Sequence, residues 1–271
     1  MQTCLLRFVL SRLDPRAAPI VTRLAQLNRW PSLRTAVIIS LTIACLSLVG
    51  WVWLLIFDHY IPQNSPLRLT LLWLGMISIM ALTAIPSGMS SISARLTGRD
   101  VRSQEFTLLR ITHLTARDLI HGYFGAAILR RRLFLLVLAG LIPNIMGLAL
   151  VGYSESGAQN YAMMRLVVLL LAVVGLWELC LVGGLTGAAV ALVLRSESLA
   201  SLLTTFTFFI LVIIVIVLIF IALLTDDPTV ILLVSAGLVL VPYGMVRLAL
   251  RSRWLWIDRI LAKYPKLSVE L

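Results

Sequence analysis

Six long, strongly apolar stretches divide this chain. They cover residues 36–57, 69–94, 133–153, 166–194, 199–224 and 229–250. A hydrocarbon core about 30 Å thick is crossed by roughly 20 apolar residues in a helix, which satisfies its own backbone polar groups. Hydrophobic residues make up 60% of the chain and charged residues only 13%, a composition outside the range of soluble domains. The sequence therefore predicts an all-α, polytopic membrane protein with a six-helix transmembrane bundle.

The positive charges are distributed unevenly over the segments that join these stretches. If there are six spans, 21 of the 23 basic residues fall on one side of the membrane, in residues 1–35, 95–132, 195–198 and 247–271. Lysine and arginine are retained on the cytoplasmic side during insertion. We therefore expect both termini to be cytoplasmic, in a bacterial cytoplasmic (inner) membrane. The same asymmetry explains the net charge of +11 through topology and contact with membrane lipids, so we expect no nucleic-acid partner.

The two ends of the chain carry basic segments with apolar faces. In residues 1–35, Ile20, Val21, Leu24 and Leu27 recur at helical spacing, which predicts an amphipathic interfacial helix; a merely basic flank is the alternative. Residues 251–271 form a basic tail, where Trp254 and Trp256 indicate a second interfacial segment.

The fourth stretch contains the features expected of a membrane interior. Glu178 is the one ionisable residue well inside a span, and it either lines a substrate route or makes a satisfied packing contact. Gly183 and Gly187 are four residues apart, and Gly184 shares the spacing with Ala188. Small residues at this spacing let another helix approach closely, either within the chain or across a dimer.

The insertion at residues 95–132 is the longest polar segment between two spans. We expect Gly98 to end the extension of the second span, and Thr115 with Asp118 to form a capping box. A first short helix is expected from Ser103, and a second helix follows Thr115. The second helix has an apolar face at spacings of three and four residues. This face comprises Leu119, Ile120, Tyr123, Phe124, Ala127 and Ile128. The pattern predicts a pair of short helices that lipid headgroups or a docked protein must stabilise, because short helices alone are marginal in water.

The sequence QEFTLLRITHLTARDLIHGYFGAAILRRRLFLLVLAGLIP resembles the segment between spans two and three of ABC exporter permeases of the type-2 membrane family. The matching positions are Glu105, Thr107, Leu108, Leu109, Thr112, Leu114, Thr115 and Asp118. In LVLRSESLASLL, a further likeness to the turn between spans four and five falls on Arg195, Ser196 and Ala200. The chain departs from the family in having His113 where a proline is usual. It also has only Thr225 to Thr229 where the family has re-entrant helices.

The resemblance implies that the insertion holds a cytoplasmic coupling helix, seated in a groove of a separate ATP-binding cassette subunit. It also implies a second permease subunit, in a homodimer or a heterodimer, and export of a substrate that the spans do not identify. The alternative is a non-transporting integral membrane subunit of a larger complex that retains the permease-like fold.

The sequence contains no motif for catalysis by this chain. The phosphate-loop pattern GxxxxGK[ST], HExxH and CxxC are all absent, so ATP hydrolysis is expected in the partner subunit and no cofactor or metal is expected. His59, His113 and His121 do not form a ligand set, and we expect the last two to line the cytoplasmic surface.

Overall fold

The computed structural model describes Val21 and residues 33–57, 65–101, 114–147, 159–225 and 227–263. All secondary structure in these residues is helical. The labelled helices are α3 (Leu33–Ile56), α4 (Pro66–Thr83), α5 (Ile85–Val101), α7 (Ala116–Arg130), α8 (Arg132–Gly140), α10 (Gln159–Leu194), α11 (Glu197–Leu224), α12 (Pro228–Arg251) and α13 (Leu255–Lys263).

Five helical segments of the described chain are long and apolar enough to cross a membrane. They are Arg34–Leu54, Pro66–Val101, Val167–Leu194, Glu197–Ile219 and Thr229–Arg251. The third predicted stretch, 133–153, begins as a shorter apolar helix over Phe134–Gly147 with a turn at Leu141, and its last residues lie outside the described ones. The architecture is that of an all-helical, multi-pass chain, as the composition predicted.

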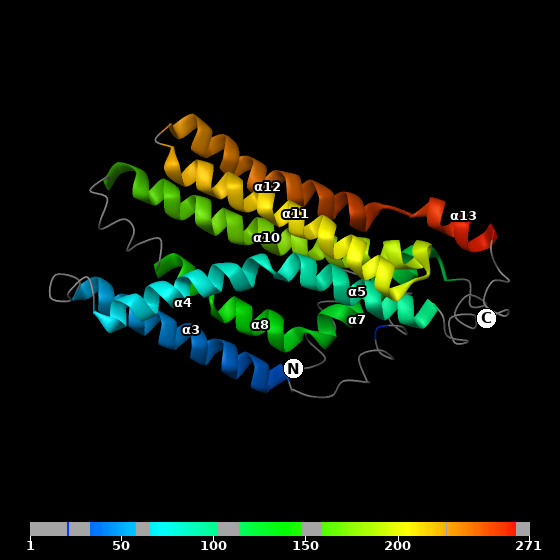
Figure 1. Ribbon diagram of the computed structural model, residues 1–271, viewed down its shortest axis with the longest axis horizontal. Helices are drawn as coiled ribbons and strands as arrows, with labels where there is room; N and C mark the ends of the chain where they lie inside the picture. Colours follow the sequence, from blue (N-terminus) through cyan, green and yellow to red (C-terminus); the bar gives the residue numbers. More distant parts are fainter. Residues whose placement is uncertain are drawn as a thin grey trace.

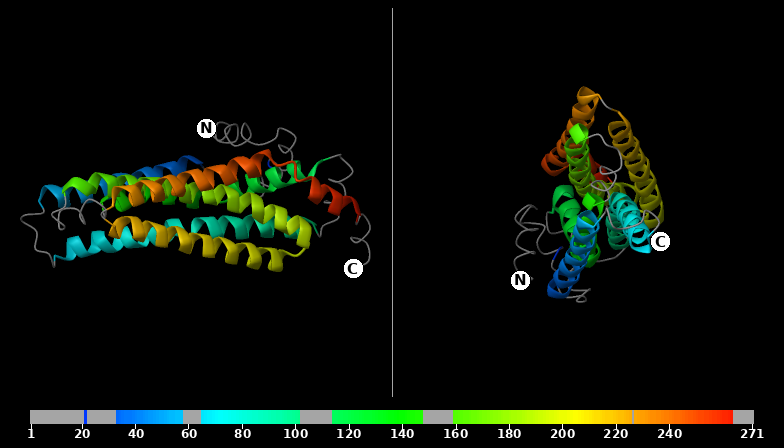
Figure 2. Two further views of the ribbon diagram at one scale, coloured as in Figure 1. Left: turned by 90° about the horizontal axis from the view of Figure 1, so that it is seen from above. Right: turned by 90° about the vertical axis from the view of Figure 1, so that its left-hand side faces the viewer.

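Helix α10 is the central element of the bundle. Half of the residues in its most apolar part are buried, whereas the corresponding share is 17% for α3 and 22% for both α11 and α12. It packs on α5, α11 and α12, while α3 packs mainly on α8 (Figure 1). Figure 2 shows the same helices from above and from one end, running along a common long axis. The low burial of the outer helices is normal for a chain whose outer face is solvated by lipid.

Local chemistry explains where several helices begin. The Ser65 hydroxyl accepts a hydrogen bond from the Arg68 amide at 3.3 Å, and Pro66 occupies the first turn of α4. Asp227 caps α12, accepting from the Thr229 amide at 2.8 Å. Because these caps sit immediately outside apolar runs, the predicted bounds of the spans are close to the observed ones.

Proline positions coincide with breaks in two of the three apolar segments that contain them. The chain turns at Ala84, two residues before Pro86, so that α4 and α5 are separate helices within one long span. A second turn, at Leu141, precedes Pro143, whereas α12 continues through Pro242.

The expected end of the second span at Gly98 is wrong, because α5 continues to Val101. The glycine is needed for packing instead. A Cβ atom on Gly98 would lie 2.7 Å from the Cα of Glu197, so only glycine lets α5 and the start of α11 cross this closely. Glu197 follows Ser196, the N-cap residue of α11, and Arg195, whose φ is 50°.

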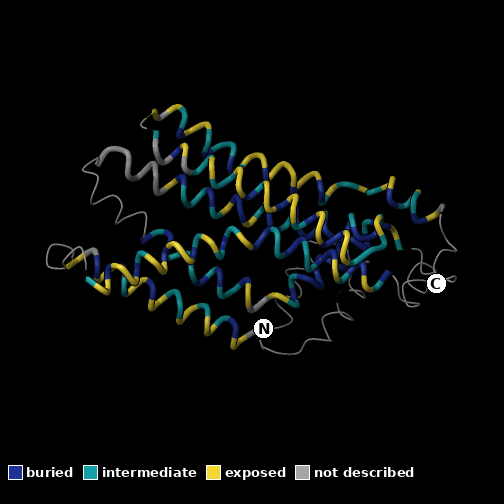
Figure 3. Tube along the Cα trace, in the orientation of Figure 1, coloured by how far each residue is buried: buried dark blue, intermediate teal, exposed yellow. Residues whose placement is uncertain are grey.

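The most buried part of the described chain lies at the end of the bundle that holds α7 (Figure 3). There α7 joins one apolar cluster with α10, α13 and Val21. The N-terminal segment 1–35 was predicted to be an interfacial helix; apart from Val21 and residues 33–35 it lies outside the described residues. Helix α7, which belongs to the predicted insertion 95–132, is thus part of the buried core.

Candidate docking site and membrane interior

The predicted docking residues divide into two groups. Glu105, Thr107, Leu108, Leu109 and Thr112 fall in residues 102–113, outside the described residues. We call residues 102–113 the connecting segment. Thr115 and Asp118 are described and start α7, directly after it.

The predicted capping box at Thr115 is confirmed. The Asp118 carboxylate accepts hydrogen bonds from the Thr115 amide at 2.9 Å and from the Thr115 hydroxyl at 2.8 Å. The Asp118 amide donates to the Thr115 hydroxyl at 3.3 Å. Asp118 is only 2% exposed, so this end of the connecting segment is held by hydrogen bonds between Thr115 and a buried carboxylate.

Helix α7 is present as predicted, but the expectation of one apolar face and one polar face is wrong. Leu119, Ile120, Tyr123, Phe124 and Ala127 are buried as expected. His121 is also buried, at 1% exposure, instead of lining the cytoplasmic surface. Neighbouring helices cover α7 on several sides, since α5, α8, α10 and α13 all pack against it. Periodicity within one helix cannot report how many neighbours surround it.

A polar contact ties α7 to the last turn of α5. The Tyr123 hydroxyl, on a fully buried side chain, donates a hydrogen bond to the Asp100 carboxylate. Arg130, at the end of α7, interacts electrostatically with Arg99 and Asp100. Burial, and then repulsion from Arg99, lower the pKa of Arg130, whereas attraction to Asp100 raises it. Asp100 therefore offsets a local excess of positive charge where the two helices meet.

The C-terminal helix supports the same end of α7. The Ala116 amide, in the first turn of α7, donates to the Asp258 carboxylate of α13 at 2.7 Å. Ile257 and Leu261, on the same face of α13, are buried in the apolar cluster with α7. Sequence reasoning missed Asp258, and a contact across 142 residues leaves no local signal of it.

We expect Asp118→Ala to destabilise the bundle by about 1–3 kcal/mol, because α7 loses two hydrogen bonds to a charged carboxylate that is itself buried. The measurement is reversible unfolding in mixed detergent micelles, followed by far-UV circular dichroism.

The matched control is Asp227→Ala. Asp227 also caps a helix through its carboxylate, but its side chain is exposed and water can replace it. The loss for Asp118→Ala should exceed that for Asp227→Ala; equal losses would show that the buried cap is no more important than an exposed one.

The glycines of the fourth span pack against helices of the same chain. A Cβ atom on Gly183 would lie 2.8 Å from the Pro86 carbonyl oxygen, and one on Gly187 would lie 2.3 Å from that of Ser90. On Gly184, a Cβ atom would meet the ring of Phe124 at 2.4 Å. Of the two partners predicted for these glycines, the structure gives the one within the chain: α10 lies against α5 and α7 here.

Glu178 is half-buried in α10. Its Oε2 atom is buried and has no hydrogen-bond partner among the described residues. Neither the glycines nor Glu178 form a metal site, and the described residues contain no group of three His, Cys, Asp or Glu side chains that could hold a metal ion.

Comparison with models of protein families, with curated proteins and with solved structures finds no match for this chain.

Proposed function

We propose that this chain is the membrane-spanning permease subunit of an ATP-binding cassette transporter. In this proposal a separate nucleotide-binding subunit hydrolyses ATP, docks on the connecting segment and drives export through a route shared with a second permease subunit. The chain spans a bacterial cytoplasmic membrane six times, with residues 133–153 as the third span and both termini in the cytoplasm.

The observation that supports this proposal best is that both ends of the connecting segment are anchored in the bundle. Val101, just before it, is only 7% exposed and belongs to the apolar cluster that contains α7. Thr115, just after it, is held by the buried carboxylate of Asp118. A force applied to the connecting segment would therefore be transmitted to α5 and α7 together.

The contact between α5 and α10 extends this path into the membrane-spanning region. Gly183 and Gly187 bring the two backbones together, so a displacement of α5 acts on the central helix of the bundle. Interfaces packed this closely shift between discrete arrangements rather than deforming gradually. Asp118 acts in this account as a positioning residue, and the side chains that contact the partner are expected in the connecting segment, led by Leu108 and Leu109.

The experiment is ATP hydrolysis by the purified complex in lipid vesicles. The chain is co-expressed with its ATP-binding cassette subunit, and hydrolysis is compared with that of the ATPase subunit alone. The proposal expects hydrolysis to be stimulated at least several-fold by the complete complex. A complex that assembles but leaves hydrolysis unchanged would contradict transport.

One observation favours the second candidate, a non-transporting membrane subunit. Helix α11 ends at Leu224 and α12 begins at Pro228, so three residues connect them. This leaves no room for re-entrant helices between the last two spans. The vesicle experiment separates the candidates, since this second one expects stable assembly with other membrane subunits and no stimulated hydrolysis.

A further inference from the structure

A groove between α5 and α11 combines charge, hydroxyl groups and exposed apolar side chains. Its volume is about 810 Å³, within the range of sites that bind small molecules. Its polar part is formed by Ser91 and Arg95 of α5 and by Glu197, Ser198, Ser201 and Thr205 of α11. Leu202, Phe206 and Phe209 form the apolar part. The docking and membrane-interior residues described above do not line it.

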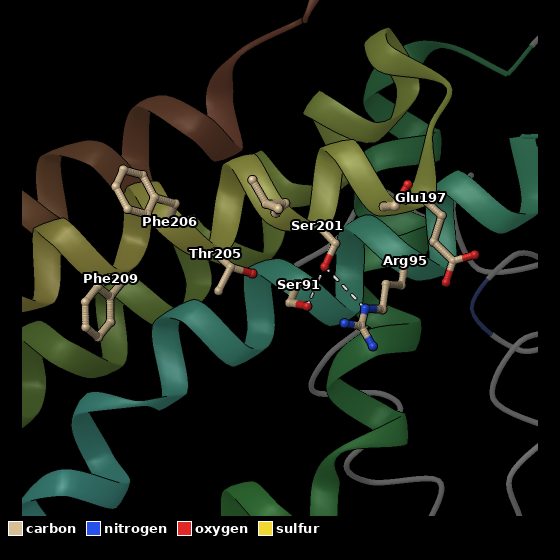
Figure 4. A pocket seen from close by; sticks show the side chains of 9 residues that line it. Ser91, Arg95, Glu197, Ser201, Thr205, Phe206 and Phe209 are labelled. Atoms are coloured by element: carbon tan, nitrogen blue, oxygen red, sulfur yellow. Dashed lines mark hydrogen bonds between the residues drawn. The ribbon is translucent and has the colours of Figure 1, made fainter.

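Hydrogen bonds within the groove fix the position of the arginine. The hydroxyls of Ser91 and Ser201 are 2.7 Å apart, and Arg95 Nε donates to the Ser201 hydroxyl at 3.2 Å (Figure 4). This hydrogen bond uses only Nε, so both Nη groups of the guanidinium can bind a ligand, and their planar arrangement matches the oxygens of a phosphate. The groove therefore offers an oriented phosphate-binding group at the level where α11 begins.

The negative charge of Glu197 shares the groove with Arg95 but does not neutralise it by contact. Among the described residues no ion pair joins the two side chains, and Figure 4 shows the Glu197 carboxylate beyond Arg95 as seen from Ser91. The crossing of α5 and α11 at Gly98 holds the backbone of Glu197 in place. Two opposite, separated charges are complementary to a zwitterion and not to a simple anion.

The polarity of the groove changes along α11. Glu197, Ser198 and Ser201 lie near the start of the helix, and Arg95 of α5 lines the groove with them. Farther along, Leu202, Phe206 and Phe209 are 71%, 63% and 56% exposed, on a helix apolar enough to lie in a membrane. A ligand that fits both parts has a polar headgroup at the interface and an acyl chain in the hydrocarbon.

We propose that the α5–α11 groove binds a zwitterionic aminophospholipid of the surrounding bilayer. Its phosphate contacts Arg95 and the Ser91 and Ser201 hydroxyls, its ammonium donates to Glu197 and Ser198, and one acyl chain lies along Phe206 and Phe209. Ethanolamine phospholipids have this chemistry, because their ammonium group can donate hydrogen bonds. Choline phospholipids carry the same net charge but have no N–H group. This site is independent of the proposed transport function.

The test is lipid titration of the purified full-length chain in detergent, read by native mass spectrometry. The probes are phosphatidylethanolamine, phosphatidylcholine and phosphatidylglycerol with identical acyl chains. We expect the ethanolamine lipid to bind about tenfold more tightly than the choline lipid, which corresponds to one charge-assisted hydrogen bond. Tighter binding of phosphatidylglycerol than of phosphatidylethanolamine would overturn the proposal, and so would equal binding of all three lipids, which is ordinary contact with bulk lipid.

Two substitutions test the contacts of the ammonium group and of the phosphate group separately. Glu197→Ala removes the acceptor oxygens and should abolish the preference for ethanolamine over choline, and Arg95→Gln should weaken the binding of all three lipids about tenfold. Arg99→Gln is the matched control: Arg99 is exposed on the same helix one turn away and does not line the groove. If Arg99→Gln reproduces the effect of Arg95→Gln, the site assignment is wrong.

Two further measurements check for misfolding of the Arg95 variant and for the role of the acyl chain. Ser201→Ala removes the hydroxyl that holds Arg95 and should weaken binding while changing less of the surface, which guards against a misfolded Arg95 variant. Soluble glycerophosphoethanolamine should bind far more weakly than the lipid. If it binds equally well, the acyl chain has no role and the lipid assignment fails.

Discussion

Gly187→Ala is expected to destabilise the folded bundle by about 3 kcal/mol, at the upper end of the usual cost of overpacking. The new Cβ atom would lie 2.3 Å from the Ser90 carbonyl oxygen and 3.0 Å from the Ser90 carbonyl carbon. These are backbone atoms and cannot rotate away, so α5 and α10 must separate. The measurement is reversible unfolding in mixed detergent micelles, with helix content followed by circular dichroism.

Gly237→Ala is the matched control, because it makes the same change inside a membrane-spanning helix. A Cβ atom on Gly237 of α12 meets nothing within 4 Å. The stability of the Gly237→Ala variant should be unchanged or raised by up to about 1 kcal/mol, since alanine has a higher helix propensity than glycine. If Gly187→Ala were as stable as Gly237→Ala, the close contact between α5 and α10 would be wrong.

Leu108→Asp combined with Leu109→Asp is expected to abolish co-purification of the ATP-binding cassette subunit. In the proposed function both leucines contact the ATPase subunit, and there each buried charge without a partner would cost several kcal/mol. Such a loss exceeds what a complex of ordinary affinity can absorb. The measurement is affinity purification of the full-length chain from solubilised membranes, with the ATPase subunit quantified in the eluate.

The control for this pair carries two aspartates elsewhere at the same end of the bundle. Leu255→Asp with Ala262→Asp changes exposed residues of α13. That variant should retain the ATPase subunit. Retention of the subunit by the Leu108 and Leu109 variant would contradict docking through the connecting segment.

The sequence alone predicted the features that depend on neighbouring residues. The fifth apolar stretch, 199–224, corresponds to α11 over Glu197–Leu224, and the sixth, 229–250, to α12 over Pro228–Arg251. Apolar run length and the local caps at Ser196 and Asp227 determine these bounds. The capping box of Thr115 and Asp118 is equally local, since its three-residue spacing is visible in the sequence.

The features that sequence reasoning missed depend on contacts between distant segments. Gly98 has the local signature of a helix end, yet it marks the place where α5 crosses the start of α11, a hundred residues later in the chain. Likewise, nothing near Asp258 indicates that its carboxylate accepts from the Ala116 amide. The serines and the arginine of α5 could be recognised as a polar stripe, but their pairing with Ser201 could not.

Site-specific photo-crosslinking can show whether the connecting segment contacts an ATP-binding cassette subunit. A photoreactive amino acid is placed at position 108 of the full-length chain in intact membranes, and at position 202 of α11 as a control exposed to lipid. We predict a protein crosslink from position 108 to a subunit that carries a phosphate-loop motif, and none to that subunit from position 202. Crosslinks from position 108 only to lipid, or only to proteins without an ATP-binding cassette, would rule out docking through the connecting segment.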